Sequence, residues 1–285
     1  MHWINYFIDL LRQFLPSFGN RLAHVATYTR ELPINLDRMY ENALDWEHLP
    51  FLHRSTFSYI EKTEAGAWGW RARAALHPKS FTTSMRLELT LDREKNRWIT
   101  KTRGGLGKGT EIWTHAIPLG ENKIKVIVDF YVPKLPAFLK KMYANQYVET
   151  YAQLYDEDLW MMAYRQKQLD KLKGSGEQAL QKEKVLGNLA DVKEKVPIEF
   201  EFNQQVYRLV SFNDTFMAHT LTCPHMLGPL NDADIQQGIL ECPWHGYKFD
   251  LSSRKCISGQ KCRLAPAPEI EIDAEKGILL AKLQT

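Results

Sequence analysis

The sequence predicts an α+β protein in which a curved antiparallel sheet, packed on a long helix, precedes a smaller all-β domain. Three observations predict this fold class. Short strand-like segments separated by turns follow one another between residues 57 and 132. A helical stretch runs from about Pro136 to Leu172, and apolar and polar residues alternate again between Val196 and Leu283. The sheet and the long helix together are expected to enclose an apolar cavity.

The chain is expected to be mostly helical up to about residue 50. Residues 2–18 carry an apolar stripe, but neither the basic region nor the small-residue cleavage site of a signal peptide. This segment therefore predicts an amphipathic helix packed on the protein. The alternative, a helix lying on a membrane surface, is disfavoured because its polar face has few basic residues. The protein is predicted to be cytoplasmic.

The strands of the first domain are predicted to form an antiparallel meander, because each is short and a turn separates it from the next. They are expected over Phe57–Thr63, Ala67–Ala74, Ser84–Leu91, Arg97–Thr102, Thr110–Pro118 and Lys123–Val132. The glycine-rich run Gly104–Gly109 lies between two of these strands and matches neither the dinucleotide pattern nor the P-loop pattern. We interpret it as a hairpin loop, and no NAD or flavin motif is visible in the sequence.

The predicted domain boundaries follow a change in composition. Residues 1–172 are assigned to the first domain. A polar, lysine-rich stretch predicts a linker over residues 173–195, with a short helix in it. Residues 196–285 are assigned to the second domain. Its strands are expected over Ile198–Phe202, Val206–Val210, Ile270–Ile272 and Ile278–Lys282.

The composition is that of an ordinary globular protein. The chain has 285 residues, enough for two domains, with 44% hydrophobic and 25% charged residues. Its formal net charge of +3 is too small to indicate nucleic-acid binding. No apolar run reaches the length of a membrane-spanning helix. The four cysteines fit a reducing compartment better than a disulfide scaffold.

Two short segments of the second domain carry the clearest chemistry. Cys223 and His225 form a C-x-H pair, and Cys242 and His245 form a C-x-x-H pair. Two thiolates and two imidazoles are the ligand set of a Rieske [2Fe–2S] centre, in which histidines replace two cysteines on one iron and raise the reduction potential. Zinc is the alternative, but zinc fingers do not usually pair one cysteine with one histidine in each half.

The residues around these two motifs also favour an iron–sulfur cluster. Pro224 and Pro243 stiffen the two segments at their second positions. Gly228 and Gly246 permit tight backbone turns over the sulfur atoms. Both segments therefore resemble the two cluster-binding loops of Rieske proteins.

The other residues of the loops indicate which class of Rieske protein they resemble. Pro229 and Trp244 occupy positions at which Rieske proteins of respiratory complexes carry extra, disulfide-forming cysteines, so the loops resemble the oxygenase or ferredoxin type. The remaining cysteines, Cys256 and Cys262, follow in a polar hairpin. We interpret them as ordinary thiols. The alternative is a disulfide, which is unusual in a reducing compartment.

The first domain contains a second candidate metal site, in which Asp45, His48 and His53 form the pattern D-x₂-H-x₄-H. On a helix, Asp45 and His48 would share one face. Pro50 predicts that the helix kinks or ends before His53. Two histidines from such a turn and a distant carboxylate make the facial triad of a non-haem Fe(II) oxygenase.

The third ligand of this site is expected on the long helix. Asp158 is favoured, because Glu157-Asp158 followed by bulky apolar residues resembles the ligand segment of Rieske oxygenases, and Asp156 is the alternative. An acidic run on a helix is more often a solvated face, and a pair of histidines is more often structural. The iron interpretation gains weight because an electron-transfer centre needs an acceptor.

Together these residues resemble the catalytic α subunit of Rieske non-haem iron oxygenases, which hydroxylate rings or remove methyl groups. The resemblance covers nearly the whole chain and implies a helix-grip, START-like catalytic domain. It also implies that Asp45 bridges a cluster histidine and an iron histidine. The family usually places the Rieske domain first, whereas here the order is reversed. A homo-oligomer is implied as well, and the reversed order puts in question its trimeric, head-to-tail form.

Together, these expectations predict that the protein is the oxygenase component of a Rieske-type system. A separate ferredoxin and/or flavin reductase would pass electrons from NAD(P)H to the cluster, and then to Fe(II) held by His48, His53 and Asp158. There O₂ would be used to hydroxylate or demethylate a small apolar, and in one version aromatic, organic substrate. The alternative is a Rieske electron-transfer protein fused to a hydrophobic-ligand-binding domain without oxygenase activity. A second iron site in the first domain distinguishes the two.

Overall fold

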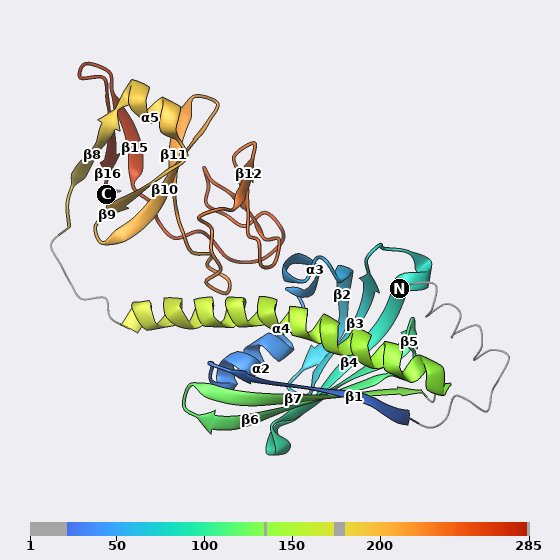
Figure 1. The fold of residues 1–285 in the computed structure, drawn as a ribbon. Coiled ribbons are helices and arrows are strands. Elements are labelled where there is room, and N and C mark those ends of the chain that lie inside the picture. Colours follow the sequence, from blue (N-terminus) through green and yellow to red (C-terminus); the bar gives the residue numbers. More distant parts are fainter. Residues whose placement is uncertain (1–21, 134–135, 174–179, 284–285) are drawn as a thin grey trace. The chain divides into compact units, whose positions relative to one another are not determined.

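The chain divides into two compact units in the computed structural model, which describes residues 22–133, 136–173 and 180–283 (Figure 1). The first unit ends at Ala163 and the second begins at Tyr164. The predicted helix over residues 2–18 lies outside the described residues. Among the residues that are described, no helix is long and apolar enough to cross a membrane.

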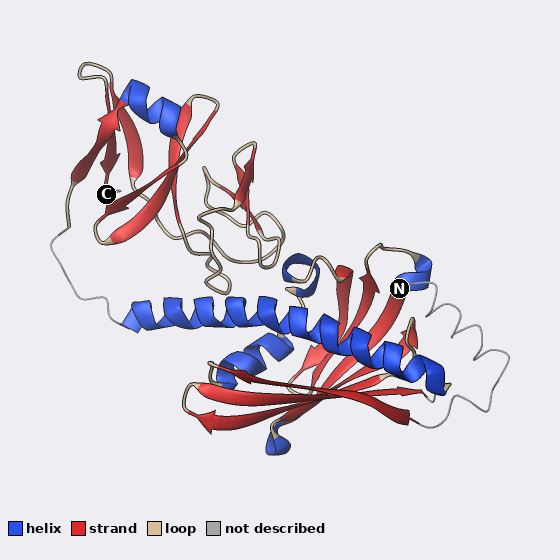
Figure 2. Ribbon diagram, in the orientation of Figure 1, coloured by secondary structure: helices blue, strands red, loops and turns tan. Residues whose placement is uncertain are grey.

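The first unit is an antiparallel sheet of seven strands with a long helix over one face (Figure 2). The strands are β1 (Leu22–Leu32), β2 (Phe57–Gly66), β3 (Gly69–Leu76), β4 (Ser84–Asp92), β5 (Arg97–Gly105), β6 (Glu111–Gly120) and β7 (Lys123–Pro133). The helices are α2 (Leu36–Leu44), α3 (Leu49–Leu52) and α4 (Ala137–Lys173). The order β1-β7-β6-β5-β4-β3-β2 confirms the predicted meander from β2 to β7 and the predicted fold class.

The expectation of a mostly helical start is wrong for β1. This strand pairs antiparallel with β7, and Leu32 of β1 lies opposite Ile124. Both side chains are fully buried. Exposed side chains alternate with more buried ones along most of β1, which is the two-residue period of a strand. The segment therefore forms an edge strand beside the last strand of the meander, a pairing that local sequence does not reveal.

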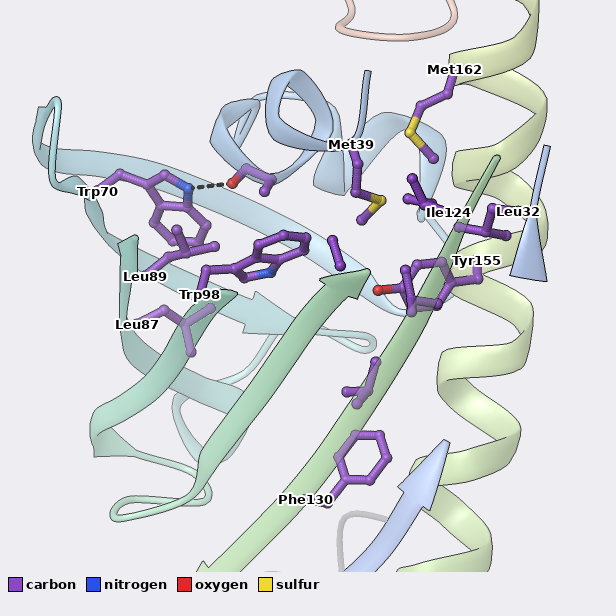
Figure 3. Packing of buried hydrophobic residues seen from close by; sticks show 14 of the residues in the cluster. Leu32, Met39, Trp70, Leu87, Leu89, Trp98, Ile124, Phe130, Tyr155 and Met162 are labelled. Atoms are coloured by element: carbon purple, nitrogen blue, oxygen red, sulfur yellow. Dashed lines mark hydrogen bonds between the residues drawn. The ribbon is translucent and has the colours of Figure 1, made fainter. Parts of the chain in front are cut away.

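The core of the first unit lies between the sheet and α4 (Figure 3). Trp70 of β3 and Trp98 of β5 are each 5% exposed, and the indole N–H of Trp70 donates to the carbonyl of Ala43 at 3.0 Å. Tyr155 and Met162 of α4 belong to the same buried cluster. Each large apolar side chain buried in this way stabilises the fold by about 1.5–3 kcal/mol. Packing, rather than helix propensity, therefore holds α4 in place.

A buried carboxylate, Glu88 of β4, lies on the face of the sheet that points away from α4. It accepts hydrogen bonds from Arg71 Nε at 2.6 Å and from Arg103 Nε at 3.1 Å. Burial alone would raise the pKa of Glu88, but the bonds from Arg103 and Arg71 outweigh it and lower the pKa. Because the folded pKa lies below the unfolded value, this carboxylate stabilises the fold above the unfolded pKa. The contribution is lost as the pH falls through the folded pKa.

Glu88→Gln is expected to lower the free energy of unfolding by about 1 kcal/mol at neutral pH, a modest loss because both arginines are half-exposed. The loss should shrink in acid, where the wild-type carboxylate is itself protonated. Urea unfolding at a series of pH values measures both effects. Glu64→Gln is the matched control, because Glu64 reaches Arg71 from an exposed position and its removal should cost little. A loss that is independent of pH would contradict the assignment.

The second unit contains three small antiparallel sheets in its described residues. Its strands are β8 (Glu183–Asn188), β9 (Ile198–Phe202), β10 (Gln205–Phe212), β11 (Thr215–Thr220), β12 (Asp234–Gln236), β13 (Ile239–Glu241), β14 (Lys248–Asp250), β15 (Glu269–Asp273) and β16 (Ile278–Lys282). The sheet orders are β11-β10-β9, β12-β13-β14 and β15-β16-β8. Leu209 and Leu279 are fully buried members of the core of this unit. The predicted small β domain is confirmed.

The segment predicted as a linker over residues 173–195 contributes to the second unit. β8 pairs with β16, and the short helix α5 (Leu189–Lys195) follows it. The side chain of Asn188 caps α5, and Val192 is buried in the same core as Leu279. The polar composition of this segment is that of an edge strand and a surface helix, whose few apolar side chains are enough to pack on the core.

Candidate metal centres

The connection between α2 and α3 carries the histidine motif of the first unit. The side chain of Asn35 caps the start of α2, which ends at Leu44. Asp45 is the C-terminal cap of α2, and His48 immediately precedes α3. The expectation that Asp45 and His48 share a helical face is therefore wrong. A turn between two short helices brings them together instead, with Asp45 Oδ2 3.4 Å from His48 Nδ1.

The structure brings His48, His53 and Asp158 together at one place. One potential ligand atom from each residue lies within 4.8 Å of the other two. Asp158 Oδ1 is 3.0 Å from His53 Nε2 and 3.5 Å from His48 Nε2. All three residues are buried. Two imidazole nitrogens and a carboxylate oxygen are a donor set that fits Fe(II), and their role as ligands stays a prediction.

The electrostatics of this cluster favour charged side chains. Burial alone would lower the pKa of His48, but contacts with Asp158 and Asp45 outweigh it and raise the pKa to about 10. Burial would raise the pKa of Asp158, but hydrogen bonds with His48 and His53 hold that pKa well below its ordinary value. The cluster therefore holds an imidazolium beside a carboxylate. A divalent metal would replace the proton, because only neutral imidazole binds a metal.

Two side chains that the sequence analysis missed orient this triad. Asn42 of α2 is buried, and its Nδ2 donates to Asp158 Oδ1 at 2.8 Å. Glu157 Oε2 lies 2.5 Å from His53 Nδ1. A carboxylate at Nδ1 fixes the proton there and turns Nε2 toward the ligand position. The sequence held only weak signals for these roles: Glu157 adjoins Asp158, and Asn42 precedes Asp45 by three residues.

Asp156, the alternative carboxylate ligand, lies away from the histidines. Its side chain is 67% exposed and pairs with Arg30 of β1 at 2.6 Å. Residues two apart on a helix do not face the same neighbours, so Asp156 and Asp158 cannot serve one site together. The geometry therefore favours Asp158.

Glu157→Gln is expected to weaken metal binding to the triad by about 10–100-fold, the usual effect of losing an outer carboxylate behind a metal-binding histidine. Anaerobic titration with Co(II), followed by absorption spectroscopy, measures the affinity without requiring turnover. Glu149→Gln, at an exposed position earlier on α4, is the matched control and should leave the affinity unchanged. If both variants bound Co(II) like the wild type, Glu157 would have no orienting role.

In the second unit, each cluster motif forms a tight turn. The backbone N–H of Cys223 donates to the carbonyl of Gly228 at 2.8 Å. The backbone N–H of Cys242 donates to the carbonyl of Tyr247 at 2.9 Å. In the second turn, the N–H of Gly246 also donates back to the carbonyl of Cys242 at 2.9 Å. Both turns therefore fold a cysteine and its neighbouring histidine into one compact loop.

The four predicted cluster ligands lie close together. Cys223 and Cys242 are each 1% exposed, and the ring centroids of His225 and His245 are 4.6 Å apart. The contact between the two buried thiols lowers the pKa of Cys242 and raises that of Cys223. Two thiols and two imidazoles in this arrangement fit a [2Fe–2S] cluster, which would bind both thiols as thiolates.

The two loop glycines have different structural roles. A side chain at Gly228 would place its Cβ 2.9 Å from the indole of Trp244, which is fully buried. Glycine is required there because the two loops approach closely. Gly246 has a φ of 64°, in the left-handed region that glycine adopts without strain. The packing of one loop on the other thus supports the pairing of the two motifs.

The C-terminal part of the chain is a Rieske domain. Residues 182–268 match the family model of the Rieske [2Fe–2S] domain, a range that contains all four candidate cluster ligands. No curated protein matches the chain significantly.

Similar solved structures each cover part of the chain. Norcoclaurine synthase from Thalictrum flavum is 18% identical over 55% of this chain and 91% of its own, with a TM-score of 0.39. A START superfamily protein from Mycobacterium smegmatis is 16% identical over 49% of this chain and 99% of its own, with a TM-score of 0.40. The ferredoxin of carbazole 1,9a-dioxygenase from Nocardioides aromaticivorans is 19% identical over 36% of this chain and all of its own, with a TM-score of 0.32.

Proposed function

We propose that this protein is the oxygenase component of a Rieske-type system, with a mononuclear Fe(II) in its first unit. The observation that carries the proposal is the buried convergence of His48, His53 and Asp158, in a chain that also contains a Rieske domain. His48, His53 and Asp158 would hold the Fe(II), which would supply the activation of dioxygen.

Within this proposal, the surrounding residues orient the triad. Glu157 holds the Nδ1 proton of His53, and Asn42 holds one oxygen of Asp158. Asp45 Oδ2 lies 3.4 Å from Nδ1 of His48, where its negative charge faces the second histidine. The resemblance to Rieske oxygenases implies a further role for Asp45, as a carboxylate that couples the two metal sites.

The proposed substrate is a small apolar organic molecule. The side chains between the sheet and α4 are aromatic and aliphatic, with Trp70, Trp98, Leu87 and Phe130 among them (Figure 3). A ligand that entered this core would be held by apolar contacts rather than by charge. Electrons would come from NAD(P)H through a separate ferredoxin and/or flavin reductase, because the sequence carries no nucleotide motif of its own.

Iron analysis of protein loaded anaerobically tests the proposal. The expected content is about three iron atoms per chain, two in the cluster and one in the triad. Nitric oxide added to the reduced protein should give a high-spin iron–nitrosyl EPR signal beside that of the reduced cluster. A His48→Ala/His53→Ala variant should lose only the nitrosyl signal. Product formation is then assayed with a reductase and small aromatic compounds.

A second candidate function is electron transfer joined to the binding of a hydrophobic ligand. The observation that favours it is that the charge of the Asp158 carboxylate is balanced by protonated His48, so the triad needs no metal for charge balance. The same iron analysis separates the two functions. About two iron atoms per chain in protein supplied with excess iron, and no nitrosyl signal, would remove the oxygenase proposal and leave the electron-transfer protein.

A further inference from the structure

Two cysteines outside the cluster motifs face each other in the second unit. The backbone N–H of Cys256 donates to the carbonyl of Cys262 at 3.1 Å, and the N–H of Leu264 donates to the carbonyl of Arg254 at 2.9 Å. These bonds place Cys256 and Cys262 directly opposite each other on two antiparallel segments. Residues opposed in this register have Cα atoms about 5.5 Å apart, which lies within the range that a disulfide spans.

The two thiols are reachable from solvent and chemically different. Both are half-buried, and they interact with each other. Burial raises the pKa of Cys256, but the Ser258 hydroxyl, 3.2 Å from its Sγ, together with backbone N–H groups and the Cys262 thiol, lowers it overall. Burial and the neighbouring Cys256 raise the pKa of Cys262 to about 11. One cysteine is thus the readier nucleophile and the other a resolving thiol.

The cysteine hairpin is bonded to the strand that follows the second cluster loop. The N–H of Ile257 donates to the carbonyl of Lys248, the first residue of β14, at 2.8 Å. Phe249 of β14 forms a bridge pair with Cys256. Cys256 therefore lies between β14 and Cys262. A disulfide between the two cysteines would close the loop of residues 257–261. It would also tie Cys262 to β14 through Cys256.

We propose that Cys256 and Cys262 form a reversible disulfide next to the Rieske cluster. The oxidant is a low-molecular-weight disulfide such as glutathione disulfide. The Cys256 thiolate attacks one of its sulfur atoms, breaks the S–S bond and releases one glutathione thiolate. Cys262 then loses its proton and attacks the mixed disulfide at Cys256, which releases the second glutathione. Two electrons pass from the cysteine pair to the oxidant, and an excess of a dithiol reverses the exchange.

Peptide mapping of the full chain with its cluster assembled tests this inference. The protein is treated with glutathione disulfide, alkylated and digested with trypsin, which cuts after Lys255 and Lys261. The expected product is the peptide of residues 256–261 linked to that of residues 262–263, with the loss of two alkylatable thiols per chain. Dithiothreitol should restore both thiols. Cluster absorbance, recorded on the same sample, should stay constant throughout.

Single variants keep the outcome interpretable. Cys262→Ser is expected to trap glutathione on Cys256, because the resolving thiol is gone. Cys256→Ser should abolish the linked peptide. The inference is overturned if both wild-type cysteines remain alkylatable, or if each carries glutathione without a link. It is also overturned if the link includes Cys223 or Cys242, or forms only after the cluster absorbance has disappeared.

Discussion

Asp158→Asn is expected to remove the mononuclear iron and leave the Rieske cluster in place. Asp158 Oδ1 is the atom on which His48, His53 and Asn42 all converge, and an uncharged amide is a poor ligand for Fe(II). Iron content should fall from about three to about two atoms per chain. The iron–nitrosyl EPR signal and product formation should both be lost. Iron analysis and EPR on one preparation measure the change.

The control for this variant is Asp156→Asn, two residues earlier on α4. Asp156 is exposed and pairs with Arg30 rather than with the histidines, so all the iron should remain. The EPR signal of the reduced cluster serves as an internal check that Asp158→Asn is folded. Retention of the third iron by Asp158→Asn would show that this carboxylate is not a ligand and would remove the facial triad.

Cys223→Ser should have the opposite effect on the two metal sites. The hydroxyl of serine is not a thiolate donor, and the site is buried, so the cluster should not assemble. Iron content should fall to about one atom per chain, and the cluster EPR signal should vanish. The iron–nitrosyl signal should persist, because its three ligands lie in the first unit. Reductase-dependent product formation should stop, because no electrons reach the triad.

Cys256→Ser is the matched control for Cys223→Ser, since it makes the same chemical change in the same unit outside the cluster motifs. It should retain the cluster signal in full. Loss of the nitrosyl signal together with the cluster in Cys223→Ser would contradict independent metal sites. A cluster signal of normal intensity in Cys223→Ser would show that this residue is not a ligand.

Local patterns in the sequence predicted most of the strands, because each has its own alternation and its own turns. The meander from β2 to β7 follows directly from those signals. β1 could not be predicted in the same way, since its partner β7 lies about a hundred residues later, and long-range pairing overrides local propensity. The polar segment before Val196 was misread for a related reason. Its strand β8 is defined by pairing with β16, near the end of the chain.

The same distinction applies to the candidate sites. The four cluster positions have a spacing specific enough to be recognised in the sequence. The triad could be anticipated only through the presence of that cluster, because two histidines and an aspartate are common. Asn42 and Glu157 escaped notice because their contacts join positions 116 and 104 residues apart. No spacing rule encodes such contacts, whereas the folded sheet and α4 create them.

The separation of the triad ligands along the chain has a consequence for how the protein acquires its metals. His53 and Asp158 are 105 residues apart, and six of the seven strands of the sheet, β2 to β7, lie between them in the sequence. The three side chains come together only after the sheet has formed and α4 has packed on it, so a metal could bind them only in the folded first unit. The cluster ligands all lie between residues 223 and 245, on neighbouring loops. The cluster site therefore depends on a short stretch of chain, whereas the triad depends on the fold of the whole first unit.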